Sequence, residues 1–226
     1  MIYFRSDYSL GAHPKVMQAL IDTNMEHTDG YAEDKYSFET ADMIREMIGK
    51  PDAHVHFMVG GTPTNTVTIA AALRPFEGVI SADSGHIYVH ETGSVEATGH
   101  RVFAAPTEDG KLRPADIEKV LLHHEDEHTV IPKMVYITHP TENGGVYTKA
   151  ELKALHDCCR EHDLYLYADG ARLGTALTWP GNDVTLKDMA DLTDAFYIGG
   201  TKLGALFGEA LIIMDDKIND HFRYMV

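Results

Sequence analysis

The chain has 226 residues, of which 44% are apolar, so a substantial core is possible and global disorder is not expected. Its 19 basic and 35 acidic side chains give a formal net charge of −16 at neutral pH. That charge repels nucleic-acid phosphates and anionic membranes, which argues against both as partners.

No targeting or membrane signal stands out in the sequence. The start, MIYFRSDYS (1–9), lacks the apolar stretch of a signal peptide, and no apolar run approaches ~18 residues. Cys158 and Cys159 are neighbours, so a disulfide between them is not expected, and we infer a reducing, cytoplasmic location. The run HHEDEH (123–128) has no matching ligand set elsewhere. We therefore interpret it as a solvated helix end and expect no metal.

The first fifty residues predict an N-terminal helical segment. HPKVMQALIDTN (13–24) places apolar side chains at helical spacing behind an early proline. KYSFETADMIREMIGK (35–50) repeats this pattern, and Gly49 marks its end. We expect residues 1–50 to form a helical arm, with the loop HTDGYAED (27–34) between its two helices.

Residues 51–226 alternate predicted strands and helices without an internal linker. The predicted strands are 53–59, 78–84, 100–106, 133–139, 164–169, 194–200 and 205–215. The predicted helices are 66–74, 115–124 and one that begins at Thr148, where Glu151 completes a capping box. This alternation indicates an α/β fold, with a mostly parallel sheet covered by helices on both faces.

The chemistry of such a fold is expected at the carboxyl ends of its strands, where open parallel sheets bind ligands. Glycine-rich or polar loops follow five of the predicted strands, and all five loops would share one edge of the sheet. They are GGTPTN (60–65), Gly85-His86, PTENGG (140–145), Asp169 to Arg172, and Gly199 to Lys202. This convergence predicts a ligand site at that edge.

Three features of this edge suggest a chemistry. Gly-Gly-Thr (60–62) precedes a helix, whose N-terminus favours an anion such as phosphate, but the dinucleotide and Walker fingerprints are absent. Lys202 follows two glycines and is either a surface lysine or a Schiff-base lysine. Asp169 either pairs with Arg172, caps a helix, or holds a protonated pyridinium nitrogen. A phosphate cradle, a pyridinium carboxylate and a Schiff-base lysine together make a pyridoxal phosphate site.

The sequence resembles the pyridoxal-phosphate enzymes of fold type I, and most closely the threonine aldolase and β-eliminating lyase family. The resemblance covers nearly the whole chain and is carried by RSD (5–7), DGYAED (29–34), VGGTPTN (59–65), GHIYVHETG (85–93), ADGAR (168–172) and GGTK (199–202). It implies that residues 51–226 form the cofactor-binding large domain. It also implies cleavage of the Cα–Cβ bond of β-hydroxy amino acids, such as threonine to glycine and acetaldehyde.

Other activities remain open because related enzymes share the same site. The alternatives are a β-eliminating lyase, an aminotransferase or racemase, and a truncated cofactor-binding domain of impaired activity. A sugar-nucleotide or NAD-type domain is disfavoured by the missing fingerprint.

The resemblance implies roles for individual residues at the cofactor. Lys202 would form a Schiff base with it, Asp169 would hold its ring nitrogen, and His86 would stack on its ring. Arg172 is also expected beside the cofactor. The phosphate would be bound by Gly60, Gly61 and Thr62.

The resemblance likewise implies how an amino acid substrate would bind. Ser6 and Arg172 would hold its α-carboxylate. Tyr31 would approach the site from a neighbouring subunit, so the protein is expected to be a homodimer or homotetramer.

The sequence departs from the family pattern at three places. The family's aldolases usually have a histidine before the asparagine of the loop after the fourth strand, and here Glu142 precedes Asn143. His86 and Glu142 are therefore both candidates for the acid–base step. Thr201 stands before Lys202, where better known aldolases have a serine. The family continues into a small C-terminal domain, and because this chain stops at Val226 we expect that domain to be absent from it.

Overall fold

The computed structural model describes residues 5–124 and 126–226. The first residues of the MIYFRSDYS segment, and Glu125 of the HHEDEH run, lie outside the described part. Cys158 and Cys159 are both free and buried.

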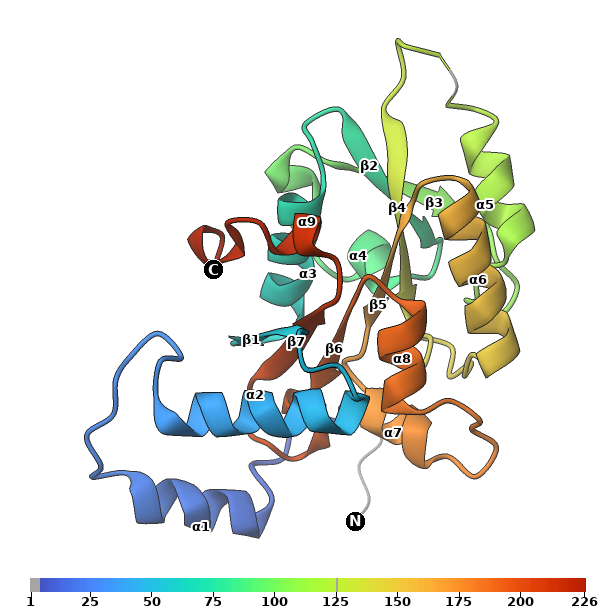
Figure 1. Cartoon of the computed structure of the whole chain (residues 1–226). Coiled ribbons are helices and arrows are strands. Elements are labelled where there is room, and N and C mark those ends of the chain that lie inside the picture. Colours follow the sequence, from blue (N-terminus) through green and yellow to red (C-terminus); the bar gives the residue numbers. More distant parts are fainter. Residues whose placement is uncertain (1–4, 125) are drawn as a thin grey trace.

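One mixed sheet forms the centre of the molecule (Figure 1). Its strands are β1 (His54–Met58), β2 (Glu77–Ala82), β3 (Arg101–Ala105), β4 (Ile131–Thr138), β5 (Tyr165–Asp169), β6 (Ala195–Gly199) and β7 (Glu209–Ile213). Their order across the sheet is β1-β7-β6-β5-β4-β2-β3. Strands β2 to β6 run parallel, whereas β7 is antiparallel to both of its neighbours. The predicted strands and the mostly parallel sheet are confirmed.

Helices cover both faces of the sheet, as the alternation predicts. The helices are α1 (Pro14–Thr23), α2 (Lys35–Ile48), α3 (Gly61–Ala72), α4 (His86–Val89), α5 (Pro114–Leu121), α6 (Lys149–Glu161), α7 (Leu173–Thr178), α8 (Leu186–Leu192) and α9 (Asp216–Asn219). Short 3₁₀ turns lie at Glu96–Thr98, Thr201–Leu203 and Phe222–Tyr224. One core contains side chains of α2, α5, α6, α7 and α8, and the other, on the opposite face, contains side chains of α3, α4 and α9.

The sequence pattern missed the short helices α4, α7, α8 and α9, because four to seven residues are too few to show a 3.6-residue period. Helix α8 nevertheless had a readable start, since Thr185 and Asp188 form a capping box. Helix α3 begins at Gly61, five residues before the predicted start, so the glycine loop is itself the first turn of the helix. None of the described helices combines the length and the apolar character needed to cross a bilayer.

The N-terminal helices differ in how they contact the rest of the chain. Helix α1 has no buried residue, while α2 places Ile44 and Ile48 in the core and packs against β1 and α8. The division of the chain into an arm over 1–50 and a domain over 51–226 stays a prediction.

The carboxyl ends of β5 and β6 approach each other so closely that glycine is required between them. A Cβ atom on Gly170 would lie 1.8 Å from the carbonyl oxygen of Tyr197, and one on Gly199 would lie 2.4 Å from that of Ala171. Gly170 therefore serves a close approach of two backbones, which fixes Asp169 and the following residues against β6.

We expect Gly170→Ala to lower the free energy of unfolding by about 1–3 kcal/mol or more, because the added methyl group must push two backbone segments apart. Urea unfolding measures the change. Gly30→Ala is the matched control, since a Cβ atom there meets nothing within 4 Å. Equal stability of the two variants would contradict the close approach.

Candidate functional site

The five loops at the carboxyl ends of β1, β2, β4, β5 and β6 meet around one cavity of about 380 Å³. Most of the residues predicted for the site line it, namely Gly60, Gly61, Thr62, His86, Glu142, Asp169, Arg172 and Lys202. The sheet edge thus brings together predicted site residues that are up to 142 positions apart in the sequence (Gly60 to Lys202). Ser6 and Tyr31 do not line the cavity.

Asp169, at the end of β5, is a buried carboxylate that is surrounded by hydrogen-bond donors. Its Oδ1 accepts from the hydroxyl of Tyr197 at 2.5 Å and from the backbone N–H of Ala171 at 2.9 Å. Its Oδ2 accepts from the hydroxyl of Tyr136 at 2.7 Å and from Nδ2 of Asn65 at 2.9 Å. These donors from β4, β6, α3 and the following turn compensate the removal of the charge from water.

The side chain of Arg172 binds Asp7 and not Asp169. Its Nη2 donates to Oδ1 of Asp7 at 3.0 Å, and its Nε donates to the other oxygen. This pairing lowers the pKa of Asp7, chiefly through the hydrogen bonds of Arg172. Within the described residues no ion pair joins Arg172 to Asp169, so the simple Asp169–Arg172 pair is not what the sheet edge forms. Ser6, the neighbour of Asp7, has a buried hydroxyl without a hydrogen-bond partner in the described chain.

Lys202 is presented by the 3₁₀ turn that follows β6. Glu209 of β7 holds this turn, because its carboxylate accepts from the N–H of Gly200 and the hydroxyl of Thr201, both at 2.8 Å. Burial raises the pKa of Glu209. The Nζ of Lys202 lies 5.8 Å from the ring centre of Tyr8, which lines the same cavity.

The glycine run at the start of α3 also lines the cavity. Gly60 is the N-cap, and the first-turn N–H groups of Gly61 and Thr62 have no acceptor within the helix. A Cβ atom on Gly61 would come within 3.0 Å of the Tyr197 hydroxyl, so a side chain there would crowd the cavity wall beside Asp169. This surface has the donors and the space that a phosphate requires.

His86, the first residue of α4, faces the cavity with one side and Glu91 with the other. Its Nδ1 lies 2.8 Å from Oε1 of Glu91, whose side chain is completely buried. The hydrogen bond to Glu91 raises the pKa of His86, and the charge of Asp169 adds to the effect, while burial opposes it. The imidazole is therefore a stronger base than a free histidine.

Glu142 lies in the loop between β4 and α6 and also lines the cavity. Its carboxylate accepts from the hydroxyl of Thr138 at 2.7 Å. Burial raises the pKa of Glu142, and the charge of Asp169 contributes in the same direction.

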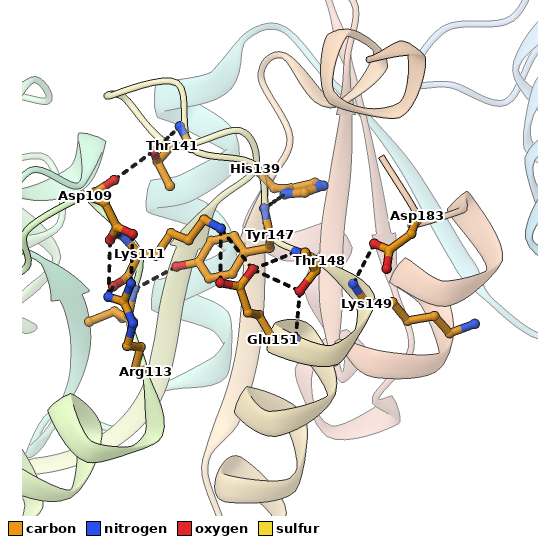
Figure 2. Close-up of polar contacts among 12 residues, drawn as sticks. Asp109, Lys111, Arg113, His139, Thr141, Tyr147, Thr148, Lys149, Glu151 and Asp183 are labelled. Carbon is orange, nitrogen blue, oxygen red and sulfur yellow. Dashed lines mark hydrogen bonds and ion pairs between the residues drawn. The ribbon is translucent and has the colours of Figure 1, made fainter. Parts of the chain in front are cut away.

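Residues of the loop that carries Glu142 make polar contacts with the segment around Asp109 and Lys111 (Figure 2). Thr141 exchanges hydrogen bonds with Gly145, at 2.8 and 2.9 Å, and its hydroxyl reaches the carbonyl of Asp109. Farther along, the Tyr147 hydroxyl accepts from the N–H of Leu112 at 2.8 Å. These contacts hold the residues on either side of Glu142 in place, and this restricts the positions that its side chain can take.

Tyr31 does not line the cavity of its own chain. It is 93% exposed, and its carbonyl accepts from Arg223. It borders a separate hollow with Phe38 and His56.

Sequence reasoning missed several residues that support the site, chiefly Asn65, Glu91, Tyr136, Tyr197 and Glu209. In the sequence, Tyr136 and Tyr197 look like ordinary strand residues, and Asn65 looks like part of the start of a helix. Glu91 carried a weak signal, since it lies five positions after His86, within the stretch that resembles the known family. The contacts of Asn65, Tyr136 and Tyr197 with Asp169 cannot be seen without the fold, because the partners are 28 to 104 positions apart in the sequence.

The chain is similar to proteins of one family over nearly its whole length. Residues 3–225 match the family model described as beta-eliminating lyase. The low specificity L-threonine aldolase of Pseudomonas aeruginosa is 32% identical over 98% of this chain and 64% of that protein. The structure of Leishmania major threonine aldolase is 52% identical, with a TM-score of 0.96, over 97% of this chain and 64% of that one. This chain thus spans just under two thirds of the length of both relatives.

A more distant likeness concerns the fold alone. A Thermus thermophilus aspartate aminotransferase superposes with a TM-score of 0.76 at 19% identity, over 96% of this chain and 57% of that one. The architecture is that of the pyridoxal-phosphate enzymes of fold type I, as the resemblance implied.

The buried histidine at the start of the β4–α6 loop, His139, should make the stability of the protein depend on pH. His139 is fully buried, and burial lowers its pKa from 6.5 to about 4. Between these values the unfolded chain binds the proton and the folded chain does not, so acid favours unfolding. This contribution to stability is complete above pH 6.5 and is lost as the pH falls toward 4. Its full size is about 3 kcal/mol.

We expect His139→Asn to be less stable than the parent at pH 7, and this difference to shrink as the pH falls from 7 to 4. Urea unfolding at several pH values measures both curves. Other groups that titrate in this range are present in both proteins, so the difference isolates His139. Parallel curves would contradict the neutral, buried imidazole.

Proposed function

The chain belongs to the β-eliminating lyase family, and on this premise we propose that the protein is a pyridoxal-phosphate-dependent aldolase. Its reaction would cleave the Cα–Cβ bond of β-hydroxy amino acids, with L-threonine or allo-threonine giving glycine and acetaldehyde. One observation carries the proposal: a single cavity presents the amine of Lys202, the carboxylate of Asp169 and the glycine-rich start of α3. The names of the relatives above support threonine as the substrate.

The residues present fit the cofactor. Lys202 would hold it through its amine, and Gly60, Gly61 and Thr62 would bind its phosphate at the N-terminus of α3. Asp169 would accept a hydrogen bond from the ring nitrogen. Of the side chains that donate to Asp169, only that of Tyr197 also lines the cavity, so its hydroxyl is the donor that a cavity ligand can replace.

Pyridoxal phosphate supplies an aldehyde that links to amines and a ring that accepts the electron pair released when a bond to Cα breaks. The surrounding side chains decide which bond breaks. Arg172 and Ser6 would hold the α-carboxylate of the substrate and so orient the Cα–Cβ bond for cleavage. Asp7 already binds the guanidinium of Arg172 as a carboxylate, in the manner that a substrate carboxylate would.

Two side chains of the cavity can take the proton of the β-hydroxyl group. His86 is a strengthened base because of Glu91, and Glu142 has a raised pKa because of burial. Each side chain is held by a hydrogen bond, His86 by Glu91 and Glu142 by Thr138. We assign the proton transfer to these two residues, with His86 as the first candidate.

We further propose that the protein is a cytoplasmic homodimer or homotetramer. The exposure of Tyr31 supports an oligomer, because an exposed residue that does not line its own cavity is available to a second subunit. The exposed apolar side chains of Leu20 and Ile21 on α1 support an interface there as well.

Lys202→Ala is expected to abolish the visible absorbance that the protein acquires with pyridoxal phosphate, because no other lysine lines the cavity among the described residues. The measurement is an absorption spectrum after removal of unbound cofactor. Lys153→Ala, on the surface of α6, is the control for nonspecific reaction of the cofactor with surface lysines, and it should keep the visible absorbance band. A full band in Lys202→Ala would sink the cofactor assignment.

A product assay distinguishes the aldolase from the other reactions that such a site supports. We expect the cofactor-loaded protein to convert L-threonine or allo-threonine to acetaldehyde and glycine in equal amounts. Ammonia with a keto acid would instead indicate β-elimination. A keto acid formed by transfer of the amino group would indicate an aminotransferase. Conversion of L-threonine to D-allo-threonine alone, by inversion at Cα, would indicate a racemase.

A further inference from the structure

We propose that Glu91 is a positioning residue for His86: it fixes the tautomer and orientation of the imidazole, and Asn65 joins this pair to Asp169. The proposal rests on the function proposed above for the catalytic use of His86. The contacts themselves do not depend on that function.

Glu91 is a buried carboxylate with no permanent cation beside it. Its Oε1 accepts from Nδ2 of Asn65 at 2.7 Å and faces Nδ1 of His86 at 2.8 Å, and its Oε2 accepts from the Ser94 hydroxyl at 2.9 Å. Within the described chain His86 is its one ion-pair partner inside 4.0 Å. A carboxylate in this position stabilises a proton on the facing nitrogen much more than an uncharged acceptor does.

The contact determines which nitrogen of His86 carries the proton. An ionised carboxylate only accepts, so Nδ1 must donate, and the neutral ring keeps its lone pair on Nε2. In the described chain no hydrogen bond occupies Nε2, and His86 lines the cavity. The imidazole is thereby prepared to accept a proton from a group in the cavity.

Other charged and titratable groups around His86 act in both directions. Asp169 favours the protonated ring and Lys202 disfavours it. The ring of His90 lies 5.6 Å away, centre to centre. Glu91 is the group in direct contact, so it has the largest influence on the proton affinity of the ring.

Asn65 connects the two buried carboxylates. Its Nδ2 donates to Glu91 at 2.7 Å and to Asp169 at 2.9 Å, and its Oδ1 accepts from the Tyr167 hydroxyl at 2.8 Å. One ring nitrogen of His86 and one carboxylate oxygen each of Glu91 and Asp169 lie within 4.8 Å of one another. The amide of Asn65 thus donates one hydrogen to each of the two carboxylates and orients both. His86 and Asp169 therefore belong to one hydrogen-bond network.

The test compares Glu91→Gln with the parent in the cofactor-free protein. Asn65 donates to the oxygen that faces Nδ1, so the glutamine keeps its carbonyl oxygen at that place and turns its NH2 group toward Ser94. An acceptor for the Nδ1 proton remains, but the negative charge is lost. Long-range proton–nitrogen NMR reports the tautomer and the titration of His86, whose signals are assigned by their loss in His86→Gln. We expect the parent to carry the proton on Nδ1, and Glu91→Gln to lower the proton affinity of His86 about tenfold, because the negative charge beside Nδ1 is gone.

Two variants control the measurement. Glu91→Asp keeps an acceptor-only carboxylate and should keep the Nδ1 proton. Ser94→Ala removes only the hydrogen bond to Oε2 and should leave the tautomer of His86 unchanged. If Glu91→Gln leaves the titration of His86 unaltered and changes only the melting temperature, Glu91 is a structural residue and the proposal is overturned.

Kinetics of the loaded protein then test the catalytic consequence. We expect Glu91→Gln to lower kcat for threonine cleavage about 100-fold with a smaller change in KM. The acidic limb of its kcat profile should shift to lower pH, because His86 would then protonate at lower pH. A protein that cleaves no amino acid would refute the proposed function while the NMR result still decides the role of Glu91.

Discussion

The organisation of the site depends on one buried carboxylate, that of Asp169. A charge placed at the end of a central strand is unstable unless donors surround it, and here the donors come from both neighbouring strands, from α3 and from the next turn. Two of the donors, Tyr197 and Ala171, also line the cavity, while Tyr136 and Asn65 lie behind it. The need to compensate one charge therefore brings three strands and a helix into a single arrangement, on which the places of His86 and Lys202 also depend.

A large part of this architecture was predictable from the sequence. Strand–helix alternation predicted every strand of the sheet, and the glycine-rich and polar loops predicted which edge of the sheet carries the cavity. Both inferences use local patterns, which the chain displays within a few residues. The short helices were missed for the same reason, since they contain too few residues to display a pattern.

The sequence could not predict the contacts behind the cavity. Asn65 meets Asp169 across 104 positions, and Tyr197 meets it across 28. The expected alternative of an Asp169–Arg172 pair illustrates the limit: proximity in sequence suggested it, yet Arg172 binds Asp7, which lies 165 positions away. Local chemistry indicated which side chains would be at the edge, but only the topology decides which of them pair.

The place of β7 has a consequence for how the protein is made. Although β7 follows the other six strands of this sheet in the sequence, it lies inside the sheet, between β1 and β6, and its Glu209 holds the turn that carries Lys202. During synthesis the sheet must stay open between β1 and β6 until residues 209–213 have emerged. A nascent chain that stops before them therefore lacks the support of the turn that carries Lys202 and exposes the edges of β1 and β6, which favours aggregation.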